Sequence, residues 1–436
     1  MAETLSVRKQ LFQYAFPSII GMLIVGIQTF IDGIFVSRGV GAIGLAAINL
    51  SMPLISVMLS IAIMIISGGV VIAGIAKGRG DEERAKGYTT LTFTVLVGSM
   101  LILSALLLLN LKGICYLLGS NDEVYPFVRK YLGIIGGAFI FYCIPNFTEA
   151  FTRFAGKPNW VFLSGTICCM VNVVLDYFFV LKFNWGVSGA AIATCIANSS
   201  AAVVLAPNVK MGRLKGGWRQ VGKIFYNGSS EMLTSVSAAI TTFIFNLFLM
   251  REIGPNGVAA LTIVCYINFA VNMSIFGLSQ ALYPLMSFNV GAKDYGRIKS
   301  LLYNSLLFSG IIGVSIYLIA LIFRQGIVNV FANNDMELAS LTTTAMTYIT
   351  LHYLVSFVNI IGTSFHTAIE RPLESAIIAL CRSIVFVLIP LFALSPLIGQ
   401  MAIWLSMPIA ELLTLFVSLP LIMSSMRRLK KKMTTN

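Results

Sequence analysis

Long stretches of the sequence contain no charged residue, and this feature constrains the fold more than any other. Gly39–Ala76 and Ile253–Ala292 each lack Asp, Glu, Lys and Arg. A stretch of about 18 or more such residues predicts a membrane-spanning helix, because lipid leaves the backbone no external hydrogen-bond partner. A spanning β-barrel would need short segments of alternating hydrophobicity, which these stretches lack. The sequence therefore predicts an all-α polytopic membrane protein.

The composition agrees with this fold class. Of the 436 residues, 57% are hydrophobic and 11% are charged, whereas about 25% are charged in a typical soluble domain. These values exclude a disordered chain, a fibrous protein and an ordinary soluble enzyme. Twelve transmembrane helices are expected, at residues 11–37, 45–76, 88–111, 125–154, 159–182, 187–208, 224–250, 257–289, 298–323, 338–368, 374–395 and 398–425.

The distribution of basic residues predicts how the helices are oriented. The net charge is +13, which in a soluble protein would suggest a nucleic-acid partner. With both termini in the cytoplasm, 22 of the 30 Lys and Arg residues fall in inner segments and 7 in outer segments. Such a bias is typical of proteins of the cell (inner) membrane, so it predicts cytoplasmic termini and explains the charge without nucleic acid.

The two halves of the sequence repeat one another, which predicts two pseudo-symmetric six-helix lobes related by an axis along the membrane normal. We expect an N-terminal lobe at 1–208, a cytoplasmic linker at 209–223, a C-terminal lobe at 224–426 and a basic tail at 427–436. The matched pairs include Gly41 and Gly254, and Asp81 and Asp294, at an offset of 213, and Pro158 and Pro372 at an offset of 214.

Acids within the predicted spans are the strongest candidates for function, because ionisable groups are costly in lipid. Counting residues along the helices places Asp32, Asp176 and Thr194 at one depth in the outer half of the N-terminal lobe. Asn172 lies one turn before Asp176 on the same helix face. Two carboxylates, an amide oxygen and a hydroxyl suit a cation such as Na⁺, or a proton shared between the acids. The alternative is that these groups only hydrogen-bond the helices together.

Other polar residues in the spans leave two interpretations open. Glu149 is either a second proton-linked acid or ligand for a cationic substrate, or the partner of Arg153 one turn later. His352 lies in the middle of a span and would titrate near neutrality, although a packing role is the simpler interpretation. Arg382 lies within a span and Glu411 lies nearer a helix end, and anchoring is expected for both.

An adaptable cavity for flat apolar cations is expected between the two lobes. Its lining would combine aromatic, thioether and amide side chains from both halves. The candidate substrate-binding residues, besides His352, are Tyr142, Asn146, Phe147, Met273, Phe276 and Gln280.

The sequence resembles the multidrug and toxic compound extrusion (MATE) family over nearly its whole length. The resemblance rests on segments 30–36, 154–158, 172–176, 186–194, 291–294 and 408–411. It implies twelve helices in two lobes and export of drugs and organic cations driven by Na⁺ or H⁺. It also implies a cation site in the N-terminal lobe at Asp32, Asn172, Asp176 and Thr194, with an acid at the position of Glu149 in one multidrug branch. Segment 228–231 lacks the proline often found there, which points to a less common bacterial branch.

These observations together predict a secondary active transporter and not an enzyme. We expect a monomeric antiporter in the cell membrane that exports drug-like organic cations or other amphipathic drugs by alternating access, coupled to H⁺ or Na⁺ and without a cofactor. A flippase for lipid-linked sugars is the alternative within the same superfamily. It would need a basic central cavity, whereas the Lys and Arg residues lie almost wholly in loops.

Overall fold

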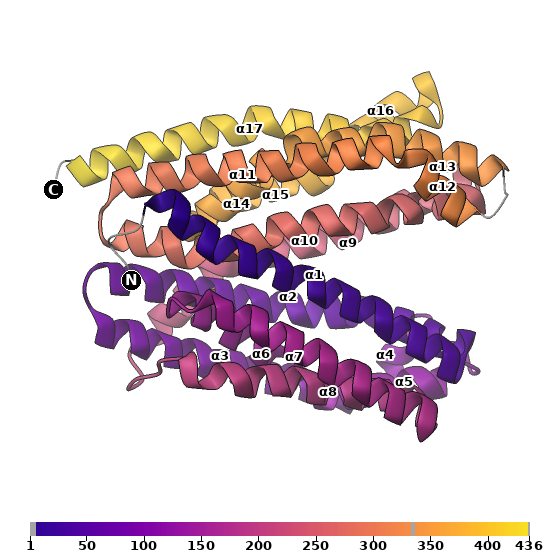
Figure 1. The fold of residues 1–436 in the computed structure, drawn as a ribbon, viewed down its shortest axis with the longest axis horizontal. Coiled ribbons are helices and arrows are strands. Elements are labelled where there is room, and N and C mark those ends of the chain that lie inside the picture. The colour runs from indigo at the N-terminus through magenta and orange to yellow at the C-terminus, as the bar shows by residue number, and fades with distance from the viewer. Residues whose placement is uncertain (1–5, 333–335, 435–436) are drawn as a thin grey trace. The chain divides into compact units, whose positions relative to one another are not determined.

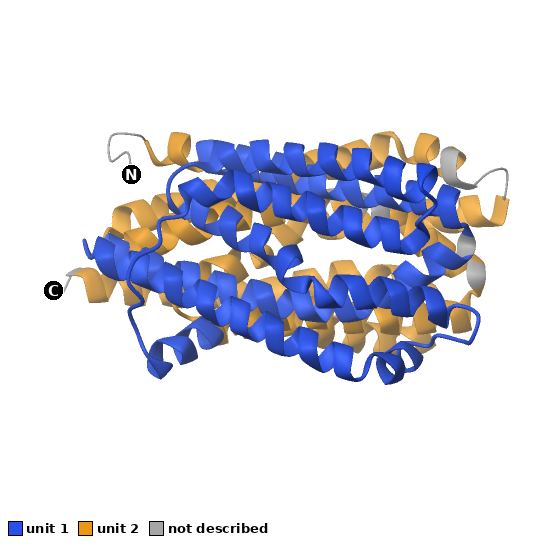
Figure 2. Ribbon diagram, turned by 90° about the horizontal axis from the view of Figure 1, so that it is seen from below, with its two compact units in different colours: residues 1–3, 13–228 blue, residues 4–12, 229–436 orange. Residues whose placement is uncertain are grey.

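The chain divides into two compact units, which Figure 2 distinguishes by colour. Lobe 1 comprises Gln13–Gly228, and lobe 2 comprises Ser229–Asn436 together with Thr4–Phe12. The computed structural model describes residues 6–332 and 336–434, and within these ranges it contains helices and no β-strand. Two helices, one at the start of each half of the chain, continue from one unit into the other.

Lobe 1 consists of helices joined by short connections (Figure 1). A π-helical turn, η1, follows α7 without a break, and a short 3₁₀ turn, η2, ends the lobe's last span. The elements are α1 (Val7–Val40), α2 (Ala42–Gly78), α3 (Glu82–Leu109), α4 (Leu111–Leu117), α5 (Tyr125–Gly137), α6 (Phe139–Phe154), α7 (Pro158–Asp176), η1 (Tyr177–Lys182), α8 (Gly186–Leu205) and η2 (Ala206–Asn208).

Lobe 2 has the same kind of architecture, again with a 3₁₀ turn, η3, and a π-helical turn, η4, inside its spans. Its first helix, α9, begins in lobe 1 and crosses the boundary at Gly228. The elements are α9 (Trp218–Glu252), α10 (Pro255–Gly291), α11 (Tyr295–Ile322), α12 (Arg324–Ala332), α13 (Met336–Ile349), η3 (Thr350–His352), α14 (Tyr353–Ala368), α15 (Pro372–Leu380), η4 (Cys381–Val385), α16 (Phe386–Ile398) and α17 (Met401–Thr434).

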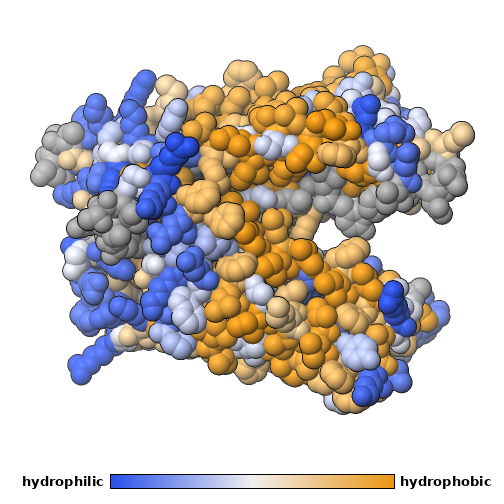
Figure 3. Space-filling view, viewed as in Figure 1, coloured by the Kyte–Doolittle hydropathy of each residue, from blue (hydrophilic) through white to orange (hydrophobic). Residues whose placement is uncertain are grey.

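The predicted all-α membrane fold is confirmed. Ten helices of the described chain are long and apolar enough to cross a membrane, and the bent pair α5–α6 makes an eleventh if it crosses as one span. The remaining predicted span corresponds to α10, a helix of 37 residues. In Figure 3, apolar side chains cover the middle of the helices and hydrophilic side chains gather toward their ends, the pattern expected of helices that cross a bilayer.

The predicted span at 125–154 is not one continuous helix. It is interrupted at Ala138, where α5 and α6 meet at a bend of 48°. Gly136 and Gly137 directly precede the break, and paired glycines are among the usual causes of helix kinks because glycine stabilises a helix poorly. The bend therefore has a local cause that the hydropathy pattern does not report.

The internal repeat is visible in the backbone. Gly41 and Gly254 precede α2 and α10 with φ of 81° and 89°, values that an L-residue with a side chain rarely adopts. Gly80 has φ of 84°, and its equivalent in the second half, Lys293, adopts φ of 58° although it carries a side chain. The same turns thus recur in both lobes at the offset of 213 found in the sequence.

Candidate functional site

Lobe 1 brings three of the predicted ion-site residues together. Asp32 lies within α1, and Asp176 is the last residue of α7. The side chains of Asp176 and Asn172 are direct polar neighbours of the Asp32 carboxyl group. Asn172 and Asp176 are fully buried, and Asp32 is partly buried. Asp32 therefore meets two residues that lie 140 or more positions later in the chain. Their meeting is consistent with the equal depth predicted for Asp32 and Asp176.

Five buried polar atoms of this cluster make no hydrogen bond of ordinary geometry among the described residues. This applies to Oδ1 of Asp32, to Oδ1 and Nδ2 of Asn172 and to both carboxyl oxygens of Asp176. A buried polar group without a partner costs about 1–3 kcal/mol, and an uncompensated buried charge costs more. The donor set of carboxylate and amide oxygens fits a proton or a hard cation such as Na⁺.

A π-helical turn and two close backbone approaches position this cluster. The π turn η1 follows directly after Asp176, and such turns are frequent at functional sites. Gly39 lies two helical turns beyond Asp32, and a Cβ atom there would come within 2.5 Å of a side-chain atom of η1. A Cβ atom on Gly189 of α8 would lie 2.9 Å from a backbone carbonyl oxygen of η1. Glycine at both positions lets α1 and α8 contact the turn that follows Asp176.

The other two predicted ion-site residues have partners on their own helices. The hydroxyl of Thr194 donates to the backbone carbonyl of Ala190 at 2.9 Å. The carboxylate of Glu149 accepts from the guanidinium of Arg153 at 2.9 Å, and the Arg153 side chain is only 3% exposed. The intrahelical pair, one of the two interpretations of Glu149, is therefore formed in this structure. The coupling roles of Glu149 and Thr194 stay predictions.

The structure adds residues that the sequence did not single out. Tyr131 of α5 is buried, and its phenol lies within electrostatic range of Asp32 and Asp176. Tyr142, already a candidate for the substrate surface, lies within electrostatic range of Asp32. Gln28 precedes Asp32 by one helical turn and is 8% exposed. Its i, i+4 spacing was a signal that Gln28 shares the face of Asp32. Tyr131 gave no such signal, because the position of α5 relative to the acids depends on tertiary packing.

Lobe 2 has a different polar network in place of free acids. Arg382 donates to Glu411 at 2.6 Å, and Asn359 donates to the other carboxylate oxygen at 2.7 Å. Ser418 in turn donates to Asn359 at 2.6 Å. The sequence offered anchoring as the role of Arg382 and Glu411, and the structure adds that tertiary folding joins the two in one ion pair. His352, also buried, bonds the carbonyl of Ile349 through Nδ1 at 2.6 Å.

The predicted substrate-binding residues lie in both lobes. In lobe 1, Tyr142 and Asn146 are one turn apart on α6 and partly buried, whereas Phe147 is fully buried against aromatic rings of α3 and α6. Three predicted residues of lobe 2 share one face of α10 and are partly exposed; these are Met273, Phe276 and Gln280. Their assignment to a substrate surface stays a prediction.

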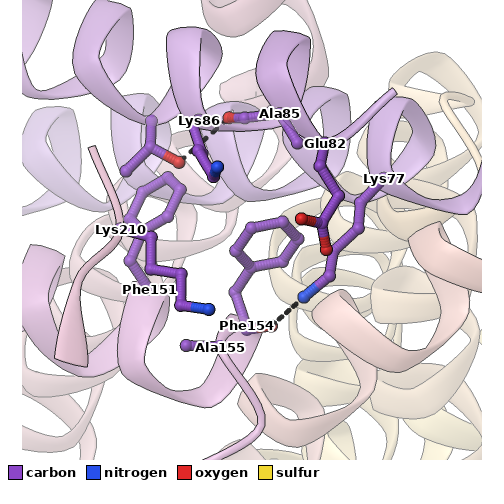
Figure 4. A pocket seen from close by; sticks show the side chains of 9 residues that line it. Lys77, Glu82, Ala85, Lys86, Phe151, Phe154, Ala155 and Lys210 are labelled. Atoms are coloured by element: carbon purple, nitrogen blue, oxygen red, sulfur yellow. Dashed lines mark hydrogen bonds between the residues drawn. The ribbon is translucent and has the colours of Figure 1, made fainter. Parts of the chain in front are cut away.

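A small pocket lined by lysines lies where α2, α3 and α6 end or begin in lobe 1 (Figure 4). Lys77 donates to the carbonyl of Phe154 at 3.5 Å and lies over its ring. Glu82 is an electrostatic partner of Lys77, and Lys86 pairs with a neighbouring glutamate at 2.8 Å. Two of the pocket's lysines thus have partners within lobe 1. These contacts are of the kind that holds helix ends together.

The MatE family model matches the chain twice, over residues 17–178 and 232–393. The chain belongs to the MATE family. The two matches fall on equivalent parts of the two lobes, consistent with the internal repeat. Family membership makes the protein a secondary transporter of the cell membrane and not an enzyme, so the predicted family, protein class and fold are confirmed.

Individual relatives are similar over nearly the whole chain. The multidrug export protein MepA of Staphylococcus aureus (strain bovine RF122 / ET3-1) is 22% identical over 422 residues, covering 94% of this chain and 92% of MepA. An FAD transporter of Shewanella oneidensis is 25% identical over 429 residues, covering 92% of this chain and 91% of the relative. The flippase alternative finds no support among these relatives.

Solved structures share the fold of this MATE protein. A multidrug resistance MATE family transporter in an outward-facing conformation superposes with a TM-score of 0.92 at 18% identity, covering 98% of this chain and 97% of the other. The Vibrio cholerae MATE transporter VcmN in its bent form superposes with a TM-score of 0.91 at 19% identity, covering 97% of this chain and 98% of the other.

Proposed function

We propose that this MATE protein is an antiporter that exports drug-like organic cations by alternating access in exchange for H⁺ or Na⁺. The supporting observation is the pair of adjacent carboxyl groups in lobe 1, which lie beside an amide, with Oδ1 of Asp32 and both oxygens of Asp176 buried and without a hydrogen bond of ordinary geometry among the described residues. The buried acids of the described part of lobe 2 differ, since Glu411 pairs with Arg382 and Glu231 accepts a hydrogen bond from Tyr283. Ion coupling therefore belongs to lobe 1.

The coupling ion would bind between Asp32 and Asp176. The side-chain oxygen of Asn172 is the third ligand, and Thr194 would supply a fourth after a change of its hydroxyl rotamer. Two ionised carboxylates in direct proximity repel each other, and burial disfavours both charges. One shared proton or one Na⁺ ion removes this repulsion. The loaded and unloaded states would then stabilise different conformations, which is the requirement for coupling.

Glu149 would act as a second coupling acid or as a ligand for a cationic substrate. In the present structure its charge is compensated by Arg153. Release from Arg153 would expose a carboxylate for either role. In lobe 1, the partly buried Tyr142 and Asn146 would offer an aromatic ring and an amide to a flat organic cation; in lobe 2, the partly exposed Met273, Phe276 and Gln280 on α10 would offer a thioether, a ring and an amide.

The substrate class follows from the relatives, one of which is named a multidrug export protein and another an FAD transporter. We propose drug-like organic cations as substrates, with FAD as the comparison compound in the assay. Both termini would lie in the cytoplasm, because that orientation places 22 of the 30 Lys and Arg residues in inner segments. The protein would work as a monomer.

The test uses purified protein in liposomes, with efflux of ethidium and of FAD measured separately. Na⁺ and pH gradients are imposed one at a time. Asp32→Asn and Asp176→Asn should each abolish gradient-driven ethidium efflux while the protein still inserts and elutes as a single species. Asp122→Asn is the matched control, because it makes the same Asp-to-Asn substitution at an exposed carboxylate outside the spans.

Undiminished efflux in both Asp32→Asn and Asp176→Asn would refute ion coupling through this pair. Efflux of FAD without efflux of ethidium would refute the proposed substrate class while leaving the coupling site intact. The ion whose gradient alone drives wild-type efflux identifies the coupling ion.

A further inference from the structure

A groove in lobe 2 lies between the first turns of α1 and the helix α11. Ser6, Arg8 and Lys9 give it one polar and basic wall, and Asn304 contributes from the other side. The rest of the lining is apolar. It consists of Leu11, Phe12, Leu307, Phe308 and Ile311, around about 930 Å³ of empty space that is partly open to the surroundings.

The two walls of this groove are fixed against each other. Gln10 accepts a hydrogen bond from Arg297 at the start of α11 at 2.8 Å. The rings of Phe12 and Phe308 meet edge to face, with centroids 5.8 Å apart and planes at 83°. Since both contacts lie within lobe 2, the groove is a built feature of one unit and does not depend on the placement of the other.

The α11 wall presents one continuous face. Its four lining residues have the spacing i, i+3, i+4 and i+7, which places them on one side of the helix. Leu307 is 46% exposed and Ile311 is 55% exposed. Apolar surface of this kind on a spanning helix contacts lipid chains, so the groove opens toward the bilayer.

The basic end is electrostatically uncompensated. Neither Arg8 nor Lys9 forms an ion pair with any acid in residues 6–332 and 336–434, and both are exposed. Both residues belong to the first turn of α1, where a spanning helix enters the membrane surface. A phosphate group at this level would meet two positive charges, and an acyl chain attached to it would lie along the apolar wall.

We propose that this groove binds one anionic phospholipid, with its phosphate at Arg8 and Lys9 and an acyl chain against Phe12, Phe308 and Ile311. A free phosphate would use only the basic end, and a neutral lipid would use only the apolar part. An anionic lipid satisfies both, and basic pockets beside spanning helices are established sites for such headgroups. The bound lipid would fasten the first turn of α1 to α11.

Binding is measured on the delipidated full chain in detergent with a fluorescent dioleoyl phosphatidylglycerol. Dioleoyl phosphatidylcholine and glycerol phosphate serve as competitors. Each basic residue near a membrane surface contributes about 1 kcal/mol, so Arg8→Gln combined with Lys9→Gln should weaken binding about 30-fold. Ile311→Trp, which fills the apolar part, should also weaken it. The linker double variant Arg213→Gln with Lys215→Gln removes the same charge elsewhere and should bind like the wild type.

Equal affinity for phosphatidylcholine, or an equal loss in the linker variant, would overturn the proposal. If glycerol phosphate displaced the fluorescent lipid as effectively as unlabelled phosphatidylglycerol does, the groove would be only an anion site. That result would also overturn the proposal. Hydrogen exchange of the wild type provides a measurement without any variant. Residues 6–12 should exchange more slowly in phosphatidylglycerol nanodiscs than in phosphatidylcholine nanodiscs, and identical rates would contradict the proposal. Because none of these measurements involves transport, their outcome is independent of the proposed antiport.

Discussion

Replacing Gly228 by alanine should destabilise the protein through a single backbone contact in lobe 1. A Cβ atom at Gly228 would lie 1.8 Å from the carbonyl oxygen of Met64 in α2. One at Gly68 would lie 2.0 Å from the carbonyl oxygen of Ile224. The two contacts run in opposite order along the chain, so α2 and the first part of α9 cross antiparallel with their backbones touching.

The cost follows from this geometry. Real Cβ atoms essentially never approach another heavy atom closer than 3.0 Å, so Gly228→Ala requires α9 to withdraw from α2 by at least about 1.2 Å. Backbone shifts of this kind cost about 1–3 kcal/mol or more. Alanine alone would stabilise the helix by about 0.5–1 kcal/mol. The net effect is a loss, because the displaced atoms are backbone and cannot change rotamer.

Gly222→Ala is the matched control on the same helix, since a Cβ atom there would have no heavy atom within 4 Å. It should gain the same helix preference without the clash, so the free energies of unfolding of the two variants should differ by the clash cost of about 1–3 kcal/mol. Heating each variant in detergent and measuring the remaining monodisperse fraction gives an apparent melting temperature. At about 2 °C per kcal/mol for a large chain, Gly228→Ala should melt at least about 2 °C below Gly222→Ala. Equal or higher stability of Gly228→Ala would refute the close contact.

Three further outcomes are expected. Lys293→Gly should raise stability by up to about 1 kcal/mol, because it relieves φ of 58° at the expense of a more flexible unfolded chain; a lower melting temperature would contradict this. Arg382→Met should destabilise lobe 2 by about 3–5 kcal/mol by leaving Glu411 uncompensated. Adding Glu411→Leu should restore most of the loss in the same melting assay, and no restoration would argue against the pair. Tyr131→Phe should shift the pH dependence of transport without impairing insertion, and an unchanged pH profile would exclude its hydroxyl from the ion site.

Local sequence patterns predicted the parts of this protein that depend on one helix at a time. The uncharged stretches located the spans, and the spacing between Asn172 and Asp176 placed both on one helix face. Depth counting then brought Asp32 to the same level. The pairing of Arg382 with Glu411 was not predictable, because the two residues are 29 positions apart and approach only through packing.

The same limit applies to the surroundings of the acids. Tyr131 lies within electrostatic range of the cluster because α5 packs inside lobe 1, and periodicity within α5 cannot report its distance to α1 or α7. The break at Ala138 depends on Gly136 and Gly137, whose weak helix preference has no effect on the mean hydropathy of the span. Patterns of polarity thus identify which groups are costly in lipid, whereas their partners depend on tertiary contacts.

The division of the chain into units has a consequence for experiments on separate halves. The first turns of α1 pack in lobe 2, and Trp218–Gly228 at the start of α9 packs in lobe 1. Each half of the gene therefore encodes a piece of the other half's structure, as in a domain swap confined to one polypeptide. A cut in the linker would give two fragments that each lack part of their own fold. Such fragments should be soluble in detergent and functional only when expressed together. The first turns of α1 and of α9 would then hold the two fragments to each other.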